Sequence, residues 1–117
     1  MEDIKILYLP LKKEWYDMHE KGIKTEDYRE IKPYWIQRFI ETNFFYEFPT
    51  REELIEMAED GSIEEVFKDF DAVKFSYGYT KKTMLFECKE ITIGKGNPEW
   101  GAPEEEVFIV KRGLRLI

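Results

Sequence analysis

A polar segment, residues 24–31, carries the side chains best suited to chemistry. It reads Lys-Thr-Glu-Asp-Tyr-Arg-Glu-Ile, so six of its eight residues, or seven with Tyr28, can carry a charge or donate a hydroxyl. A lysine in a partly buried site can serve as a base or nucleophile, which makes Lys24 a candidate. Asp27 can hold that lysine or shuttle a proton, and Arg29 offers a fork of donors to a phosphate or a base edge. These residue types favour a polar pocket, and the alternative is a solvated face whose ion pairs contribute little.

A second candidate group lies in the glycine- and proline-rich loop at 94–103. Here Lys95 can contact a phosphate, Asn97 can read a base edge and Trp100 can stack on a base. The alternative is a structured connection in which Trp100 plugs one end of the fold. The loop lacks the spacing of a phosphate-binding loop, and no helix follows it.

The elements around the polar segment place it between two helices. Residues 4–11 are apolar at most positions and predict a strand buried on both faces, and residues 12–21 predict a helix. Gly22 follows where a left-handed C-cap belongs, and Pro33 suits the first turn of the next helix. The segment between them is therefore a strand, in which Asp27 and Arg29 share one face. Lys24 stands at the strand start, where alternation is weakest, and can turn toward the same pocket.

The second half of the chain predicts an acidic helical insertion and then a run of strands. The insertion covers about 41–70, and two capping-box patterns, beginning at Thr50 and Ser62, predict helices in it. Alternation predicts strands at 71–77, 83–93 and 106–112, with a final piece at 114–117. The apolar parity changes near Lys89. Because turns join the later strands, antiparallel pairing is favoured. The expectation is a single α+β domain over residues 1–117: a small barrel of five to six mostly antiparallel strands with peripheral helices.

The polar strand resembles the signature of the ASCH domain family, Gly-x-Lys-x-x-Glu-x-Arg. Gly22, Lys24 and Arg29 match it, and Asp27 stands where the family has Glu. The order of strands and helices is similar over nearly the whole chain, and the loop at 94–103 resembles that of small bacterial and phage-type members. The resemblance implies a PUA-like barrel linked to RNA recognition.

Two catalytic branches of that family offer alternatives. One is similar to amidohydrolases that act on N4-acetylcytidine with the motif lysine, a threonine and a barrel glutamate. Lys24 matches, Asp27 replaces the threonine and supplies no hydroxyl, and Glu87 or Glu90 is the candidate carboxylate. The other resembles a single-strand ribonuclease, for which Lys24, Tyr28 and Arg29 are acid–base candidates.

Composition limits the classes of function that remain. The chain has 117 residues, a net charge of −7, one cysteine and one histidine, so no internal disulfide or cysteine-based metal cluster can form. We expect no metal or cofactor, no membrane segment and, from the acidic start, a cytoplasmic location. Residues 41–70 hold 10 acidic and 2 basic residues, and the other 87 hold 15 and 16. The acidity thus belongs to the insertion, which excludes a broadly basic binder and favours a small ligand or a few nucleotides in a pocket.

The leading hypothesis is a domain that recognises RNA or a small nucleotide or nucleoside in a polar cleft. Its proposed ligand-binding residues are Gly22, Tyr28, Arg29, Lys95, Asn97 and Trp100, and the residues that would act in catalysis are Lys24, Asp27 and Glu87. The alternatives are a small metal-free hydrolase of modified nucleosides or single-stranded RNA, and a non-catalytic module that binds protein through 41–70. A monomer or a weak dimer through 44–48 is expected. His19 and Cys88 are interpreted as packing residues.

Overall fold

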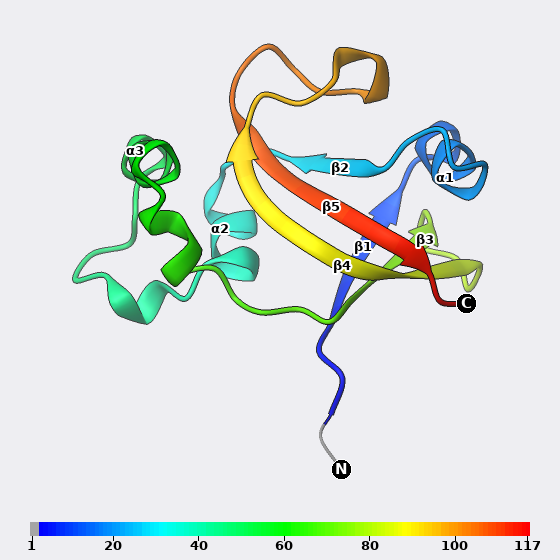
Figure 1. Cartoon of the computed structure of the whole chain (residues 1–117), viewed down its shortest axis with the longest axis horizontal. Helices are drawn as coiled ribbons and strands as arrows, with labels where there is room; N and C mark the ends of the chain where they lie inside the picture. Colours follow the sequence, from blue (N-terminus) through cyan, green and yellow to red (C-terminus); the bar gives the residue numbers. More distant parts are fainter. Residues whose placement is uncertain (1–2) are drawn as a thin grey trace. The chain divides into compact units, whose positions relative to one another are not determined.

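The computed structural model describes residues 3–117, and its class is α+β (Figure 1). The strands are β1 (Ile6–Leu11), β2 (Glu26–Arg29), β3 (Ala72–Tyr77), β4 (Thr83–Gly94) and β5 (Val107–Arg115). The helices are α1 (Lys13–Glu20), α2 (Pro33–Phe39) and α3 (Arg51–Asp60), with 3₁₀ turns η1 (Thr42–Phe44), η2 (Ser62–Glu65) and η3 (Pro98–Trp100). The five strands form one sheet in the order β1-β3-β4-β5-β2. Pairing is mixed, because β1 runs parallel to β3 while β3 and β4 are antiparallel.

Contacts divide the chain into two compact units, neither of which is one continuous stretch. The first unit comprises the chain up to Asp27, Asp69–Glu90 and Val110–Ile117, and the second comprises Tyr28–Lys68 and Ile91–Ile109. The expectation of a single domain over 1–117 stays a prediction. None of the helices in residues 3–117 combines the length and the apolar character needed to cross a membrane.

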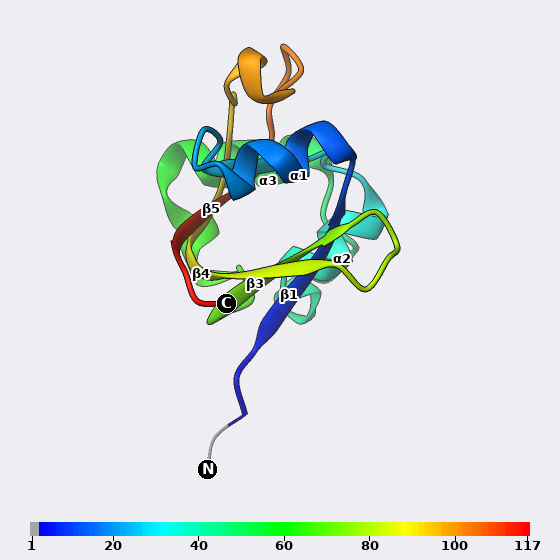
Figure 2. The same cartoon turned by 90° about the vertical axis from the view of Figure 1, so that its right-hand side faces the viewer.

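The core of the first unit is built on β1, β3 and β4, and Figure 2 shows β1 lying along β3. Leu9 is paired in register with Phe75, and Phe75 in turn with Met84 on β4; all three are buried. The expectation that β1 is buried on both faces is wrong. It stands at one end of the strand order, and Tyr8 is exposed while Leu9 is buried, so only one of its faces packs against the core.

The remaining strands follow the sequence pattern with small shifts in their ends. On β4 the buried positions change from Met84 and Phe86 to Ile93, which confirms the expected change of parity. The predicted final strand at 114–117 begins inside β5, because β5 continues to Arg115. Beyond it, backbone hydrogen bonds join Ile117 and Leu116 to Leu85.

The second unit packs α2 against β5. Pro33 occupies the first turn of α2, as predicted. Phe39 of α2 is buried, and its ring centroid lies 4.8 Å from that of Phe108 on β5. Thr50 caps α3, because its Oγ1 accepts a hydrogen bond from the Glu53 backbone N–H. The second predicted capping box is wrong, since Ser62 begins only a 3₁₀ turn and its N–H and Oγ–H both donate to the carboxylate of Asp60.

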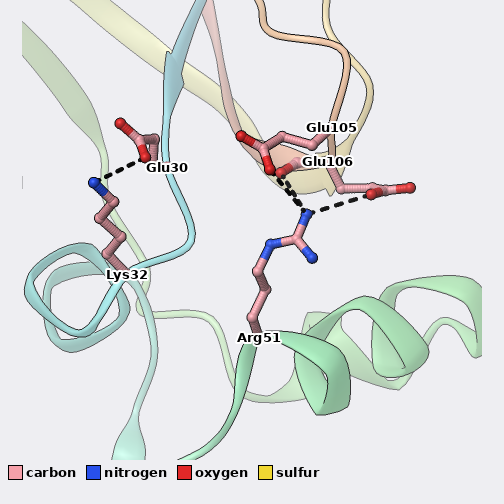
Figure 3. A network of polar contacts seen from close by, with 5 residues as sticks. All are labelled: Glu30, Lys32, Arg51, Glu105 and Glu106. Carbon is pink, nitrogen blue, oxygen red and sulfur yellow. Dashed lines mark hydrogen bonds and ion pairs between the residues drawn. The ribbon is translucent and has the colours of Figure 1, made fainter.

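Ion pairs on the second unit connect the acidic insertion to the chain before β5. Figure 3 shows Arg51, at the start of α3, reaching Glu105 and Glu106 at N···O distances of 3.8 and 3.5 Å. A separate pair joins Lys32 to Glu30 at 2.9 Å, and both of its members are exposed. Because these groups are partly or wholly solvated, each pair stabilises the fold little by itself.

Candidate functional site: a buried polar cluster in the first unit

Two oppositely charged residues of the polar segment are almost fully buried in the first unit. Lys24 is 2% exposed and Asp27 is 4% exposed. The Lys24 ammonium lies 5.0 Å from the centroid of the Trp15 ring, within range of a cation–π interaction. Lysine is almost never this buried without compensation, because an ion loses its hydration when it leaves water. Such a pair is therefore a strong candidate for a functional site.

The C-terminal cap of α1 determines where Lys24 lies. Gly22 has a φ of +76° and ends α1 in a Schellman motif: the Ile23 N–H donates to the Met18 carbonyl, and the Gly22 N–H donates to the His19 carbonyl. The Lys24 N–H also donates to the Met18 carbonyl, at 3.2 Å. A side chain at Gly22 would meet nothing within 4 Å, so glycine is required here by the backbone conformation and not by close packing.

Lys24 precedes β2, and strand alternation does not fix its direction. The structure buries it together with Asp27, while Thr25 between them is exposed. That Lys24 turns toward the same pocket as Asp27 stays a prediction.

Arg112, on β5, also belongs to the cluster, although it is not among the site residues predicted from the sequence. One Nη atom donates to the carbonyls of Lys24 and His19, at 2.9 and 3.1 Å, and Nε donates to His19 Nδ1 at 3.4 Å. The guanidinium carbon lies 4.3 Å from the centroid of the Phe86 ring, and the Arg112 backbone N–H donates to the Thr25 carbonyl. The side chain thus binds both ends of the turn that carries Lys24. Strand parity does not reveal Arg112 in the sequence, because consecutive residues of both parities, Ile109 and Val110, are buried before it.

His19 is the third polar residue of the cluster, and it is 1% exposed. Its ring stacks on Phe75, with centroids 4.3 Å apart. Burial lowers the pKa of His19 to about 3, and the positive charges of Lys24 and Arg112 add to that effect. The imidazole is therefore neutral at physiological pH. Arg112 can only donate, so Nδ1 accepts in its 3.4 Å contact with Nε, and Nε2 has no hydrogen-bond partner among residues 3–117.

Glu87 is exposed, and it lines one cavity together with Arg112 of this cluster. It lies on the face of β4 opposite the buried Phe86. Its Oε1 accepts a hydrogen bond from the Leu114 N–H at 2.9 Å, and a Cβ atom at Gly113 would lie 3.0 Å from the same oxygen. Glu87 has a structural role at this strand pair. Its assignment as a catalytic carboxylate stays a prediction.

A half-open cavity of about 400 Å³ lies beside Glu87 in the same unit. Its lining residues are Asp71, Glu87, Cys88, Lys89, Arg112, Gly113 and Leu114. Burial and the neighbouring Asp71 raise the pKa of the Cys88 thiol to about 11, so the thiolate that a nucleophile requires is scarce at neutral pH. Cys88 is half-buried and not a fully buried packing residue as expected. Across residues 3–117, no group of three or more His, Cys, Asp or Glu side chains is placed to hold a metal ion.

In the second unit, Tyr28 anchors the loop that contains the other predicted ligand-binding residues. Its hydroxyl accepts a hydrogen bond from the Asn97 N–H at 2.9 Å, and Gly96 packs so closely on its ring that an added Cβ would lie 2.5 Å away. The Asn97 side-chain oxygen accepts from the Glu99 N–H and caps η3. Lys95 is exposed, and Trp100 is half-buried. The loop is therefore held in one shape, with Tyr28 and the Asn97 oxygen already in structural hydrogen bonds.

Arg29 lies on β2 in the second unit, beside the half-buried Trp35. Its guanidinium carbon is 4.8 Å from the centroid of that ring, and that of Arg38 is 5.5 Å from the same ring. Two guanidinium groups around one indole are a chemistry suited to an anion or a nucleobase.

The structure thus groups the predicted site residues into two sets. Gly22, Lys24, Asp27 and Glu87 belong to the first unit; Tyr28, Arg29, Lys95, Asn97 and Trp100 belong to the second. No family model matches this chain, and comparisons with curated proteins and with solved structures likewise give no match.

Proposed function

We propose that this protein is an ASCH-type domain with a PUA-like barrel that recognises RNA or a nucleotide through the buried polar cluster of its first unit. The observation that carries the proposal is the near-complete burial of Lys24 and Asp27 within one compact unit. Charged groups are retained in an interior against a desolvation cost, and ligand binding is a common reason for keeping them.

The distribution of charge supports a nucleotide-sized ligand. The first unit holds 11 acidic and 12 basic residues, a net charge of +1, and the second holds 14 and 6, a net charge of −8. The unit with the cluster therefore does not repel phosphate through its net charge, yet it lacks the positive surface of a sequence-blind nucleic-acid binder.

The test is a binding measurement on Lys24→Met and Asp27→Asn. Methionine keeps the volume of the lysine stem without the charge, and asparagine keeps the shape of the carboxylate. The probes are the four nucleoside 5′-monophosphates, by calorimetry, and fluorescent single-stranded RNA octamers, by anisotropy. Loss of a charge-assisted hydrogen bond predicts binding about 10- to 100-fold weaker. Lys13→Met is the matched control, because Lys13 lies on α1, is exposed and forms a surface ion pair with Asp17.

Equal affinity of Lys24→Met, Asp27→Asn and the wild-type protein would refute the proposal. So would a wild-type protein that binds none of these probes. Alanine variants of Arg29, Lys95 and Trp100 test, one at a time, the proposed ligand contacts on the second unit.

A small hydrolase on the same cluster is the second candidate. The observation in its favour is that a buried lysine, a buried carboxylate and a neutral imidazole occur in one unit. Incubation with a panel of N-acylated nucleosides and end-labelled RNA, followed by chromatography, tests it. No turnover at high enzyme concentration removes this candidate, and turnover that disappears in Lys24→Met supports it.

A further inference from the structure

Arg112 makes more hydrogen bonds to the turn before β2 than any strand pairing requires. Three of its side-chain bonds end on this turn: two on the carbonyls of Lys24 and His19, and one on the His19 ring. The backbone of Arg112 adds a fourth, to Thr25. Residues at opposite ends of the same turn are therefore held by a single side chain from β5.

The bonded carbonyls have a particular place in the turn. The His19 carbonyl lies in the last turn of α1, where carbonyls lose their helical partners, and it already accepts from the Gly22 N–H. The Lys24 carbonyl belongs to the residue whose side chain is buried. Holding it at 2.9 Å limits the rotation of the Lys24 backbone and so limits where its ammonium can lie.

The bond to His19 fixes the second polar group. A guanidinium always donates, so Nδ1 must accept and Nε2 must carry the proton. Neither lysine nor glutamine can replace this arrangement, since neither has the planar fork that reaches two carbonyls and a ring nitrogen together. Packing of the guanidinium on Phe86, at 4.3 Å, fixes the plane of that fork.

We propose that Arg112 is the positioning residue of the candidate site, which sets the location of the Lys24 ammonium and holds His19 as the Nε2–H tautomer. The inference rests on the proposed function only in assigning Arg112 to the same site. Its consequence is that the cluster presents a fixed ammonium and a neutral N–H donor.

The first measurement is the tautomer of His19 in the folded protein. Because the chain has one histidine, long-range ¹H–¹⁵N spectra report on His19 alone. We expect a single Nε2–H tautomer in the wild type and in Arg115→Gln, and a mixture or the other tautomer in Arg112→Gln and Arg112→Lys. Arg115 is the matched control because it is also on β5, is exposed and bonds only locally, to the Ile117 carbonyl. A change in global stability alone would not alter the tautomer of the folded state.

The second measurement is the reductive methylation of Lys24 by formaldehyde and a borane reagent, followed by peptide mass spectrometry. Loss of two or three anchoring hydrogen bonds predicts that Lys24 reacts about 10-fold faster or more in the Arg112 variants. The exposed Lys13 serves as the internal reference, and its rate stays unchanged in folded variants.

An Nδ1–H tautomer in the wild type would overturn the proposal without any variant, so the test does not depend on whether Arg112→Gln folds. An unchanged tautomer together with an unchanged Lys24 rate in Arg112→Lys would also overturn it. Failure of the proposed function is distinguishable, because both measurements use the protein without nucleotide or RNA.

Discussion

The pKa of His19 makes a quantitative prediction about the stability of the fold. In the unfolded chain this histidine has its ordinary pKa of about 6.5, whereas in the folded protein the pKa is about 3. Between these values the unfolded state binds a proton that the folded state does not. The free energy of unfolding is therefore highest above pH 6.5 and falls as the pH drops toward 3.

The size of the effect follows from the two pKa values. The contribution of His19 falls by about 1.4 kcal/mol for each pH unit within the window, and by about 2 kcal/mol in total between pH 7 and pH 5. A domain of this size is stable by roughly 5–15 kcal/mol, so the change is well within measurement. In structural terms, protonated His19 would place a third positive charge beside Lys24 and Arg112 in a buried position.

Urea denaturation of the wild type and of His19→Gln, followed by tryptophan fluorescence at pH 5, 6 and 7, measures it. Glutamine keeps an acceptor for Arg112 and does not titrate. Carboxylates titrate in both proteins, so the difference between the two unfolding free energies isolates the histidine. We expect this difference to shift against the wild type by about 2 kcal/mol from pH 7 to pH 5. A difference that stays constant to within about 0.5 kcal/mol would refute the assignment of a neutral, buried His19.

Three further predictions concern single positions. Gly22→Ala is expected to destabilise the fold by about 1–2 kcal/mol in urea denaturation, because a Cβ is strained at a φ of +76°, and an unchanged midpoint would contradict the Schellman cap. Gly96→Ala is expected to lower the free energy of unfolding by about 1–3 kcal/mol, because its Cβ would lie 2.5 Å from the Tyr28 ring. A loss no larger than that of Tyr28→Phe, which removes only the hydrogen bond to the Asn97 N–H, would show that the loop moves to accommodate the methyl group. Cys88 is expected to react with iodoacetamide at pH 7.5 at least about 10-fold more slowly than glutathione, since its thiol pKa is about 11, and a rate equal to that of glutathione would contradict the raised pKa.

The sequence predicts the helix caps well, because a cap depends on residues only a few positions apart. The glycine after α1 and the threonine before α3 each act on the backbone within a few residues, and the structure confirms both caps. The predicted cap at Ser62 is wrong for an equally local reason: the Asp60 carboxylate, two residues earlier, accepts hydrogen bonds from the Ser62 hydroxyl and N–H. A pattern of residue types does not show whether a serine hydroxyl will accept from a helix N–H or donate to a nearby carboxylate.

Features that depend on contacts between residues far apart in the sequence could not be predicted in the same way. The apolar sequence of β1 suits a strand buried on both faces and an edge strand equally, and only the pairing with β3 decides between them. The polar strand predicted Lys24 and Asp27 as site residues, and both prove to be buried. Arg112 was missed because its bond to Lys24 spans 88 residues of sequence, and because both faces of β5 are buried before it, so that strand parity gives no sign of it.

The geometry of the cluster limits how strongly salt can affect the proposed binding. Arg112 uses its donors on protein carbonyls and on His19, so a phosphate bound at this cluster would meet few cationic groups. Neutralising one phosphate of a single strand gives a slope of about −0.7 in log K against log salt, and each further cationic contact adds a similar amount. A slope near −1 therefore indicates a ligand bound at the first-unit cluster. A slope of −3 or steeper would require several cations along a surface, which the +1 charge of the first unit and the −8 charge of the second unit argue against. The salt dependence thus distinguishes binding at the first-unit cluster from binding along a charged surface, even before the ligand is identified.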